Sequence, residues 1–306
     1  MSKKILFMGT PDYATKIFEE ILNNSYEIVG LFTQPDKPIG RKQLITPPHT
    51  KQFCLDNNLN IPIFQPEKLK NNDEAKKQIE DLNPDFIIVA AYGQILPKEI
   101  LDIAPCINLH ASLLPNYRGA SPIQESLLNA DTYAGVTSML MEEGLDSGDI
   151  LGLKYFKIPF EMEVAELFSE LSSIAAKLTI ETLDNFEKIN PKKQNEAEVS
   201  FCKKIKKEYG EIIFDDAKKV YQKYKAYSYW PGIYLKSGLK LKDISFVESN
   251  SINNEGEILL IEDSSIIVAC KKGSIKIGRL QAPSKKEVSA IDYIRGQRIT
   301  LGNVLI

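Results

Sequence analysis

Cysteine and histidine are scarce in this chain of 306 residues, which holds four cysteines and two histidines. The cysteines, at positions 54, 106, 202 and 270, are far apart and form no Cys-x-x-Cys pair. A structural zinc site needs four such ligands, usually in closely spaced pairs. We therefore expect no metal site. Scattered thiols without a disulfide framework are typical of cytoplasmic proteins.

Long apolar runs are also lacking. No stretch reaches the ~18 consecutive apolar residues that a bilayer-spanning helix needs. The first four residues, MSKK, lead directly into a predicted strand without the pattern of a secretory signal. We therefore expect a cytoplasmic protein that binds no membrane. Since nothing in the sequence indicates an oligomer, we expect a monomer.

A dinucleotide-binding motif is missing too, although the first half of the chain alternates strands with helices. Strands are predicted at residues 4–9, 27–33 and 85–90, and helices at 13–22, 50–57, 73–82 and 164–186. This order predicts an α/β fold with a doubly wound, mostly parallel, Rossmann-like sheet. No GxGxxG follows the first strand, and Pro11 stands where a pyrophosphate would need a backbone N–H. The sequence therefore argues against a nicotinamide cofactor.

Charge is unevenly distributed along the chain, although the net charge is only −3. Residues 203–306 hold 19 basic and 12 acidic residues, whereas residues 1–202 hold 19 basic and 29 acidic ones. Such asymmetry favours a polyanionic partner for the second half. The alternative is a solvated, lysine-rich surface.

Short strand-like runs with turn signals between them follow residue 203, and one helix at 215–224 interrupts them. The runs lie at 210–214, 233–235, 241–247, 257–261, 266–270 and 274–280. This spacing predicts a small OB-like β-barrel. The stretch 190–202 is polar and without apolar periodicity, so we predict a domain at 1–189, a linker at 190–202 and a C-terminal domain at 203–306. Lys204 and Lys206 are candidate contacts to nucleic acid in that domain.

Residues 105–125, PCINLHASLLPNYRGASPIQE, carry the densest chemistry. Asn108 and His110 stand two residues apart at the end of a short apolar strand, so their side chains point to the same face. Open α/β sheets place their ligands at the carboxyl ends of strands. Because histidine titrates near neutral pH, His110 is the main candidate for proton transfer. The alternative is a histidine held in the core. Ser121 and Pro122 are typical of a helix start.

A second stretch, residues 135–150, reads GVTSMLMEEGLDSGDI. An alternating strand runs into a loop that glycines bracket and that carries Asp146. A carboxylate there would accept a hydrogen bond from the His110 imidazole, fix its tautomer and favour its protonated form. The alternative is an ordinary loop or cap aspartate.

The blocks NLHASLLPNYRGASPIQ and GVTSMLMEEGLDSGDI, with FMGTPD at 7–12 and TQPD at 33–36, closely resemble the 10-formyltetrahydrofolate-dependent formyltransferases. The resemblance is strong over residues 4–150. It implies that 10-formyltetrahydrofolate is the co-substrate and that Asn108, His110 and Asp146 are catalytic. It also implies a folate site lined by Ser112, Leu113, Leu114, Pro115, Ala90, Ala91, Tyr92 and Gly144. Tyr92 is equally interpretable as a core aromatic.

Residues 34–48, QPDKPIGRKQLITPP, are predicted to form a long loop with four prolines. In the members of the resembled family that act on initiator methionyl-tRNA, this loop enters the acceptor arm. The resemblance therefore implies tRNA contacts from Arg41 and Lys42. Arg41 is the predicted key contact, since a guanidinium binds phosphates and base edges bidentately. The alternative is a plain surface loop.

The predicted trio permits transfer of a formyl group from N10 of the folate to an amine without a nucleophilic side chain. Asn108 and a protonated His110 would donate hydrogen bonds to the developing oxyanion. Asp146 would orient His110 and help to move the proton. An amino sugar nucleotide, glycinamide ribonucleotide or water are alternative acceptors, since the trio is shared. A non-catalytic RNA-binding protein is the alternative of a different class.

Overall fold

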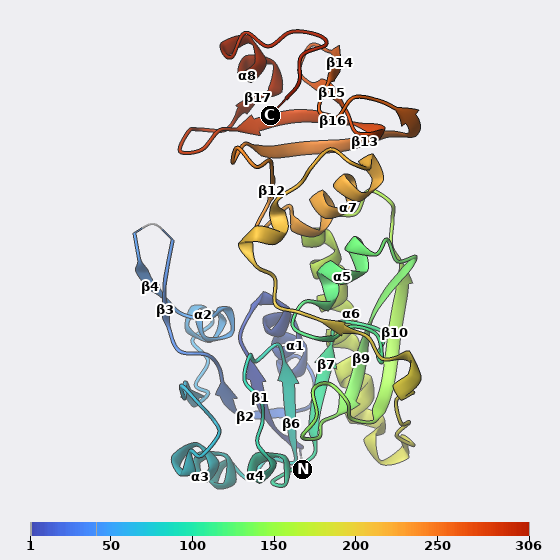
Figure 1. Ribbon diagram of the computed structural model, residues 1–306. Coiled ribbons are helices and arrows are strands. Elements are labelled where there is room, and N and C mark those ends of the chain that lie inside the picture. Colours follow the sequence, from blue (N-terminus) through green and yellow to red (C-terminus); the bar gives the residue numbers. More distant parts are fainter. Residues whose placement is uncertain (1, 41, 306) are drawn as a thin grey trace. The chain divides into compact units, whose positions relative to one another are not determined.

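A seven-stranded sheet forms the centre of the first half of the chain (Figure 1). The computed structural model describes residues 2–40 and 42–305. The strand order is β10-β9-β7-β6-β1-β2-β5. The five strands from β7 to β5 are parallel, and β9 runs antiparallel to both of its neighbours, β7 and β10. The strands are β1 (Lys4–Gly9), β2 (Glu27–Phe32), β5 (Ile63–Phe64), β6 (Phe86–Ala90), β7 (Cys106–His110), β9 (Tyr133–Leu140) and β10 (Ile150–Lys157). The predicted α/β class with a mostly parallel sheet is confirmed.

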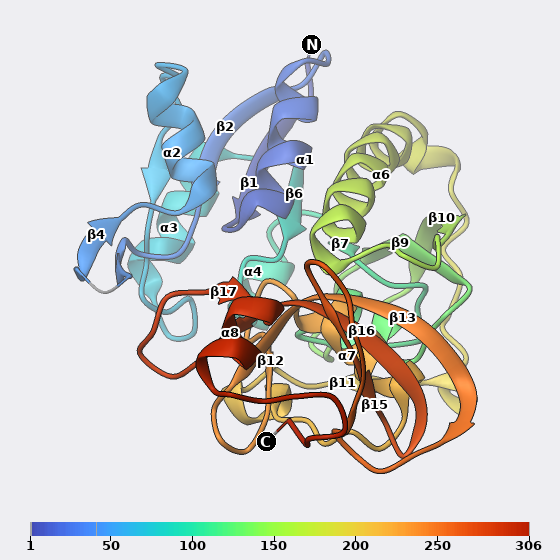
Figure 2. The same ribbon diagram turned by 90° about the horizontal axis from the view of Figure 1, so that it is seen from above.

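Helices cover both faces of this sheet. The central strands β6 and β7 are therefore buried on both sides, which explains their continuous apolar sequences. Phe18 of α1 packs edge-to-face on Phe7 of β1, and α6 lies on the same side of the sheet (Figure 2). Ile79 of α3 and Ile100 of α4 join an apolar cluster on the opposite face with Leu6 of β1. The helices up to residue 185 are α1 (Asp12–Leu22), α2 (His49–Asp56), α3 (Asp73–Leu82), α4 (Lys98–Leu101), α5 (Pro122–Leu128) and α6 (Val164–Asn185), of which α5 belongs, beyond its first residue, to the C-terminal compact unit described below.

Local signals in the sequence account for several helix starts. The Asn72 side chain accepts a hydrogen bond from the N–H of Ala75 and so caps α3, whose bounds are those predicted. Asp216 accepts from the N–H groups of Lys218 and Lys219 at the start of α7 (Ala217–Tyr227). Helix α5 begins at Pro122, as predicted.

The stretch 34–48 contains a hairpin, which its prediction as a long loop did not include. Strands β3 (Lys37–Ile39) and β4 (Leu44–Thr46) pair antiparallel, with Pro38 opposite Ile45. Proline is tolerated there because a two-stranded ribbon leaves one side of each strand unpaired. Three-residue strands are too short to show an alternation in the sequence. Arg41 lies outside the described residues.

The C-terminal part forms a six-stranded antiparallel sheet in the order β12-β13-β16-β15-β14, with β17 paired to β16. The elements are β12 (Ile233–Tyr234), β13 (Lys240–Ile252), β14 (Ile258–Ile261), β15 (Ile266–Ala269), β16 (Lys272–Gln281), β17 (Val288–Ser289), α7 and α8 (Ala290–Gly296). The prediction of a strand at 210–214 is wrong. A 3-10 helix, Lys207–Gly210, ends there, and Glu211 then forms a single β-bridge with Tyr234.

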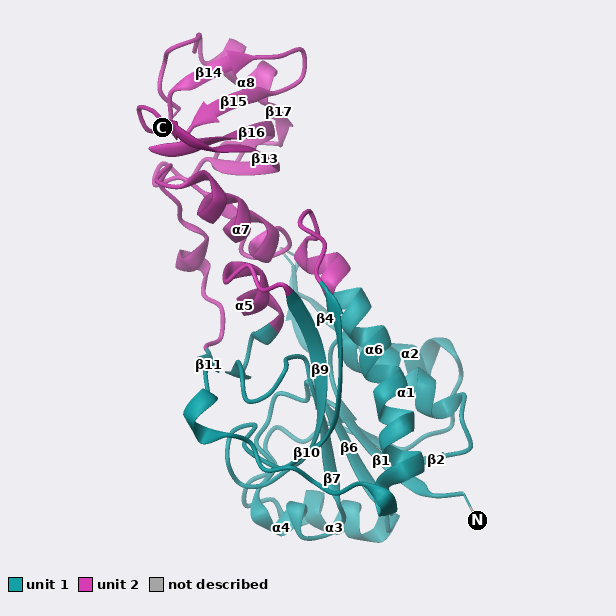
Figure 3. Cartoon of the chain, turned by 90° about the vertical axis from the view of Figure 1, so that its right-hand side faces the viewer, with its two compact units in different colours: residues 1–122, 133–157, 168–202 teal, residues 123–132, 158–167, 203–306 magenta. Residues whose placement is uncertain are grey.

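The described chain divides into two compact units (Figure 3). Unit 1 comprises residues 1–122, 133–157 and 168–202, and unit 2 comprises residues 123–132, 158–167 and 203–306. Residues 190–202 thus count with unit 1, and the predicted domain boundaries stay predictions. Among the described residues, no helix has the length and apolar character needed to cross a membrane.

Candidate active site

The carboxyl end of β7 carries Asn108 and His110. β7 is flanked by β6 and β9, so both residues lie in the middle of the sheet rather than at its edge. Both side chains are buried, with 7 % of His110 exposed. Both face Asp146, as their spacing along an extended strand predicts.

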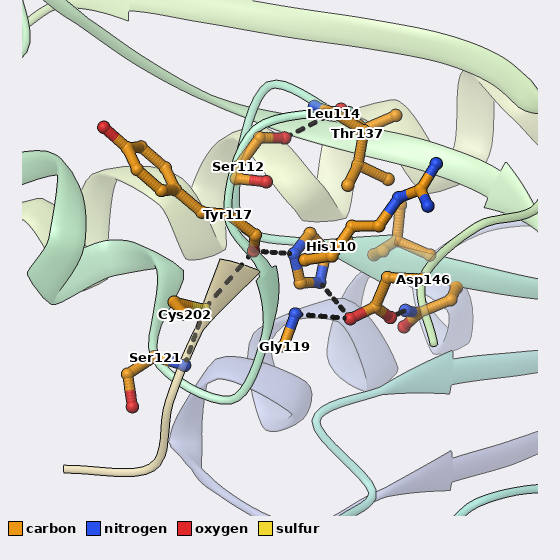
Figure 4. A network of polar contacts seen from close by, with 12 residues as sticks. His110, Ser112, Leu114, Tyr117, Gly119, Ser121, Thr137, Asp146 and Cys202 are labelled. Carbon is orange, nitrogen blue, oxygen red and sulfur yellow. Dashed lines mark hydrogen bonds and ion pairs between the residues drawn. The ribbon is translucent and has the colours of Figure 1, made fainter. Parts of the chain in front are cut away.

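Asp146 lies in the loop after β9 and contacts both residues. Figure 4 shows it beside His110 and Gly119. Its Oδ1 accepts a 3.3 Å hydrogen bond from Nδ2 of Asn108. Its Oδ2 accepts a 2.8 Å hydrogen bond from the backbone N–H of Gly119 and lies 3.7 Å from Nδ1 of His110. The structure therefore brings the predicted trio together. The imidazole and the carboxylate stand at an ion-pair distance, beyond the range of the predicted hydrogen bond.

The tautomer of His110 is set by a group that the sequence did not indicate. Nε2 of His110 lies 2.9 Å from the carbonyl oxygen of Tyr117 (Figure 4). A carbonyl oxygen only accepts, so Nε2 carries a proton. Nδ1 then faces the carboxylate of Asp146, and it gains a proton when the ring becomes charged. The carbonyl of Tyr117 therefore helps to fix the ring, and the predicted role of Asp146 in orienting it stays a prediction.

The predicted folate residues 112–115 form a tightly bonded loop after β7. The hydroxyl of Ser112 donates to the carbonyl of Asn116 at 2.6 Å. The hydroxyl of Thr137 donates to the carbonyl of Ser112 and accepts from the N–H of Leu114 (Figure 4). Leu113 and Pro115 are half-buried. Since the Ser112 hydroxyl is bonded within its own loop, it makes no Ser–His pair with His110.

The other predicted folate residues lie at the end of β6 and, for Gly144, in the loop after β9. Ala90 is buried, whereas Ala91 and Gly144 are exposed. The Tyr92 side chain is 1 % exposed and belongs to an apolar cluster, which supports its interpretation as a core aromatic. Burial raises the pKa of the Tyr92 hydroxyl well above its usual value. Its carbonyl, by contrast, accepts hydrogen bonds from Thr10 and Gln34.

The residues that hold the 117–119 loop were not predicted from the sequence. Arg118 is 4 % exposed, and its guanidinium donates to Gln194 and Glu196. β8 (Arg118–Gly119) pairs with β11 (Phe201–Cys202). Gly119 has φ +124, and a Cβ there would lie 2.2 Å from the carbonyl oxygen of Cys202. The available signal was this glycine, in the RGASPIQ block, whose backbone must pass so close to another strand.

Cys106, at the start of β7, is poorly suited to act as a nucleophile. Cys106 begins β7, and burial raises the pKa of its thiol to about 12, which disfavours a thiolate at neutral pH. Among the described residues, no three His, Cys, Asp or Glu side chains are grouped to hold a metal ion.

The candidate nucleic-acid contacts are exposed where the structure describes them. Lys42 lies in the turn between β3 and β4, in unit 1. Lys204 and Lys206 follow β11 and belong to unit 2. The Lys206 ammonium lies 3.7 Å from the carboxylate of Glu208. Arg41 is not among the described residues.

Comparison with known protein families gives two matches. Residues 3–183 match the family described as formyl transferase, and residues 204–298 match the formyl transferase C-terminal domain. A methionyl-tRNA formyltransferase of a Nitratiruptor species is 55 % identical over 300 residues, covering 98 % of this chain and 99 % of that protein. One of Campylobacter lari is 55 % identical over 303 residues, covering 99 % of each.

Solved structures are similar at lower identity. HypX from Aquifex aeolicus in complex with tetrahydrofolic acid has a TM-score of 0.65 at 17 % identity, covering 96 % of this chain and 47 % of that one. An N-formyltransferase from Helicobacter canadensis, with folinic acid and dTDP-3-aminofucose, has a TM-score of 0.68 at 15 % identity, covering 92 % and 100 %. At these identities the likeness shows the fold alone.

Proposed function

Since the chain belongs to the formyl transferase family, and within it to the methionyl-tRNA formyltransferases, we propose that it formylates the α-amino group of initiator methionyl-tRNA with 10-formyltetrahydrofolate. The observation that carries this proposal is the convergence of Asn108, His110 and Asp146 at the carboxyl end of β7. Full-length similarity to methionyl-tRNA formyltransferases favours tRNA over the other acceptors.

The trio stabilises the tetrahedral intermediate that forms when the amine nitrogen attacks the formyl carbon. Nδ2 of Asn108 has two hydrogens, and one of them is bonded to Asp146, so the other is available to the formyl oxygen. In His110, Nε2 is bonded to Tyr117, and we assign Nδ1 of the charged ring to the same oxygen. One donor of this kind is typically worth ~10²–10³ in rate.

Proton transfer completes the reaction. The bond between the formyl carbon and N10 breaks, N10 takes up a proton, and the attacking amine loses one. The Asp146 carboxylate lies beside both donors, and it accepts the proton of the amine directly or through a water. General acid–base help of this kind contributes roughly 10²–10⁴ in rate.

Folate binding is assigned to Ser112, Leu113, Leu114 and Pro115 with the backbone at Ala90, Ala91, Tyr92 and Gly144. The exposure of Ala91 and Gly144 supports a role for their main-chain groups at the pterin edge. The buried Tyr92 ring supports the fold of this strand end rather than a direct contact.

The tRNA contacts are assigned to Arg41 and Lys42 in unit 1 and to Lys204 and Lys206 in unit 2. The exposed turn between β3 and β4 and the basic character of residues 203–306 support this assignment. Because translation begins in the cytoplasm, we place the reaction there. We further propose that the enzyme acts as a monomer, which its elution volume on size-exclusion chromatography tests.

The decisive experiment measures formyl transfer from 10-formyltetrahydrofolate to charged initiator methionyl-tRNA, with charged elongator methionyl-tRNA as the control. Transfer to the initiator alone supports the reaction, acceptor and specificity together. Formyl consumption with an amino sugar nucleotide or water, and with neither tRNA, would instead move the acceptor to one of the alternatives.

A further inference from the structure

Gln194 is not a member of the trio, but its side chain hydrogen-bonds to two loops beside it. The first is the loop that contains Arg118, and the second is the loop that contains Asp146 and Gly148. Oε1 of Gln194 accepts a 3.0 Å hydrogen bond from Nε of Arg118. Its Nε2 donates two hydrogen bonds, both of 2.8 Å, to the carbonyl oxygens of Asp146 and Gly148. Only 9 % of the residue is exposed. A guanidinium only donates and a carbonyl only accepts, so this network allows one orientation of the amide.

The loop residues on either side of Arg118 each touch a member of the trio. Tyr117 accepts the hydrogen bond from Nε2 of His110, and Gly119 donates to Oδ2 of Asp146. The other end of the Gln194 amide binds the main chain of Asp146 itself. The side-chain amide of Gln194 therefore connects the loop that binds the His110 imidazole to the main chain of Asp146.

Other described side chains of residues 190–202 contact the first of these loops, and the main chain of Lys192 pairs with Ile150, where the second loop enters β10. The Ser200 hydroxyl accepts from the N–H of Tyr117, and its carbonyl accepts from the N–H of Arg118. Glu196 forms an ion pair with Arg118, but its side chain is 73 % exposed, and exposed ion pairs contribute little. Among the described residues of this segment, Gln194 hydrogen-bonds through its side chain to both loops.

We propose that Gln194 is a positioning residue for formyl transfer, which holds His110 and Asp146 at the separation that the transition state needs. The inference rests on the function proposed above. Displacing a catalytic group by about 1 Å can cost on the order of 10²-fold in rate, even when the altered residue is remote from the chemistry. Loss of the Gln194 bridge therefore lowers kcat, whereas KM for folate and for tRNA changes little.

Two variants separate the two ends of the bridge. Gln194→Met keeps the length of the side chain but makes none of its hydrogen bonds. Gln194→Glu still accepts from Arg118, but it cannot donate to the carbonyls of Asp146 and Gly148. Gln78→Met is the matched control, because Gln78 donates only within α3, to Glu74. We expect kcat to fall about 10- to 100-fold in both Gln194 variants, with each KM within about threefold, and to be unchanged in the control.

A double-mutant comparison distinguishes positioning from a general role in stability. If Gln194 acts through Asp146, Gln194→Met lowers the residual rate of Asp146→Ala by less than about twofold, because the two effects are not additive. A full additional loss of about 10-fold in the Asp146→Ala background would overturn the proposal. So would unimpaired kcat in Gln194→Glu, which remains the test if Gln194→Met does not fold. No transfer by the wild-type chain refutes the proposed function and this inference with it, whereas an active wild type with active Gln194 variants refutes the inference alone.

Discussion

Nδ1 of His110 lies 3.7 Å from Oδ2 of Asp146, and each of the two groups is also bonded to the backbone of the 117–119 loop. The backbone N–H of Gly119 holds the carboxylate, and the carbonyl of Tyr117 holds the ring. The two catalytic groups thus face each other with part of their hydrogen-bonding capacity unspent. Such preorganised donors and acceptors, aimed at charge that develops in the transition state, provide the largest electrostatic gain in catalysis.

Replacing Asp146 with alanine removes the carboxylate that receives the amine proton and faces the imidazole. We expect kcat to fall about 10²- to 10⁴-fold while KM for both substrates changes little, because the trio acts on the transition state. Steady-state kinetics with initiator methionyl-tRNA measure this. Asp81→Ala, at an exposed position of α3, is the control. An unchanged kcat in Asp146→Ala would remove Asp146 from the mechanism.

Gly119→Ala introduces a side chain where the backbone has φ +124 and a Cβ would lie 2.2 Å from the carbonyl oxygen of Cys202. The pairing of β8 with β11 must open, and the N–H that holds Asp146 moves with it. We expect a loss of at least about 2 kcal/mol in the free energy of unfolding, together with a large loss of kcat.

Chemical denaturation and kinetics on the same preparation test the Gly119→Ala prediction. Gly296→Ala, at the end of α8, is the control, because a Cβ there meets no atom within 4 Å. In a helix this exchange is worth about 1 kcal/mol in favour of alanine. Wild-type stability and activity in Gly119→Ala would show that the close approach of the two strands is dispensable.

Arg41→Ala tests the assignment of the turn between β3 and β4 to tRNA. A guanidinium that binds phosphate or a base edge bidentately is typically worth about 1–3 kcal/mol, so we expect KM for tRNA to rise about 10-fold or more. KM for folate stays the same. Lys77→Ala removes one positive charge from the exposed surface of α3 and is the control. Equal KM values for tRNA in Arg41→Ala and Lys77→Ala would show that Arg41 does not contribute to tRNA binding.

Buried thiols predict a measurable resistance to alkylation. Burial raises the pKa of Cys54 to about 11 and the pKa values of Cys106 and Cys270 to about 12. At pH 8 the native thiols therefore react with iodoacetamide more than about 10-fold more slowly than the same thiols in guanidinium chloride, because the thiolate is the reactive form. Mass spectrometry of timed samples gives the rates residue by residue.

The raised pKa values of these three thiols also predict how the free energy of unfolding depends on pH. Their pKa values are higher in the folded state, so the unfolded chain releases these protons first as pH rises. Their contribution to the free energy of unfolding is complete below about pH 8.5 and is lost as pH rises toward about 12. Denaturation midpoints between pH 8 and pH 11 measure this fall, and a rising midpoint would contradict it.

The predictions that succeeded rest on patterns between residues close in sequence. The bounds of α3 follow from Asn72 and the apolar period after it, and the common face of Asn108 and His110 follows from their spacing in β7. The failed prediction at residues 210–214 and the unpredicted strands β3 and β4 concern segments too short for a period. A resemblance of two blocks supplied the trio, and the structure brought it together.

By itself, the sequence determined the α/β class, the positions of the first main strands along the chain and the identity of the catalytic candidates, because each depends on local periodicity or on short motif blocks. Only the tertiary structure decided what holds those candidates in place. Gly119 reaches Asp146 across 27 positions, and Gln194 reaches Asp146 across 48 and Arg118 across 76. Backbone carbonyls and N–H groups make several of these contacts, and every residue except proline carries both groups. No pattern of side chains in the sequence therefore indicates which backbone groups hold the catalytic residues in the folded protein.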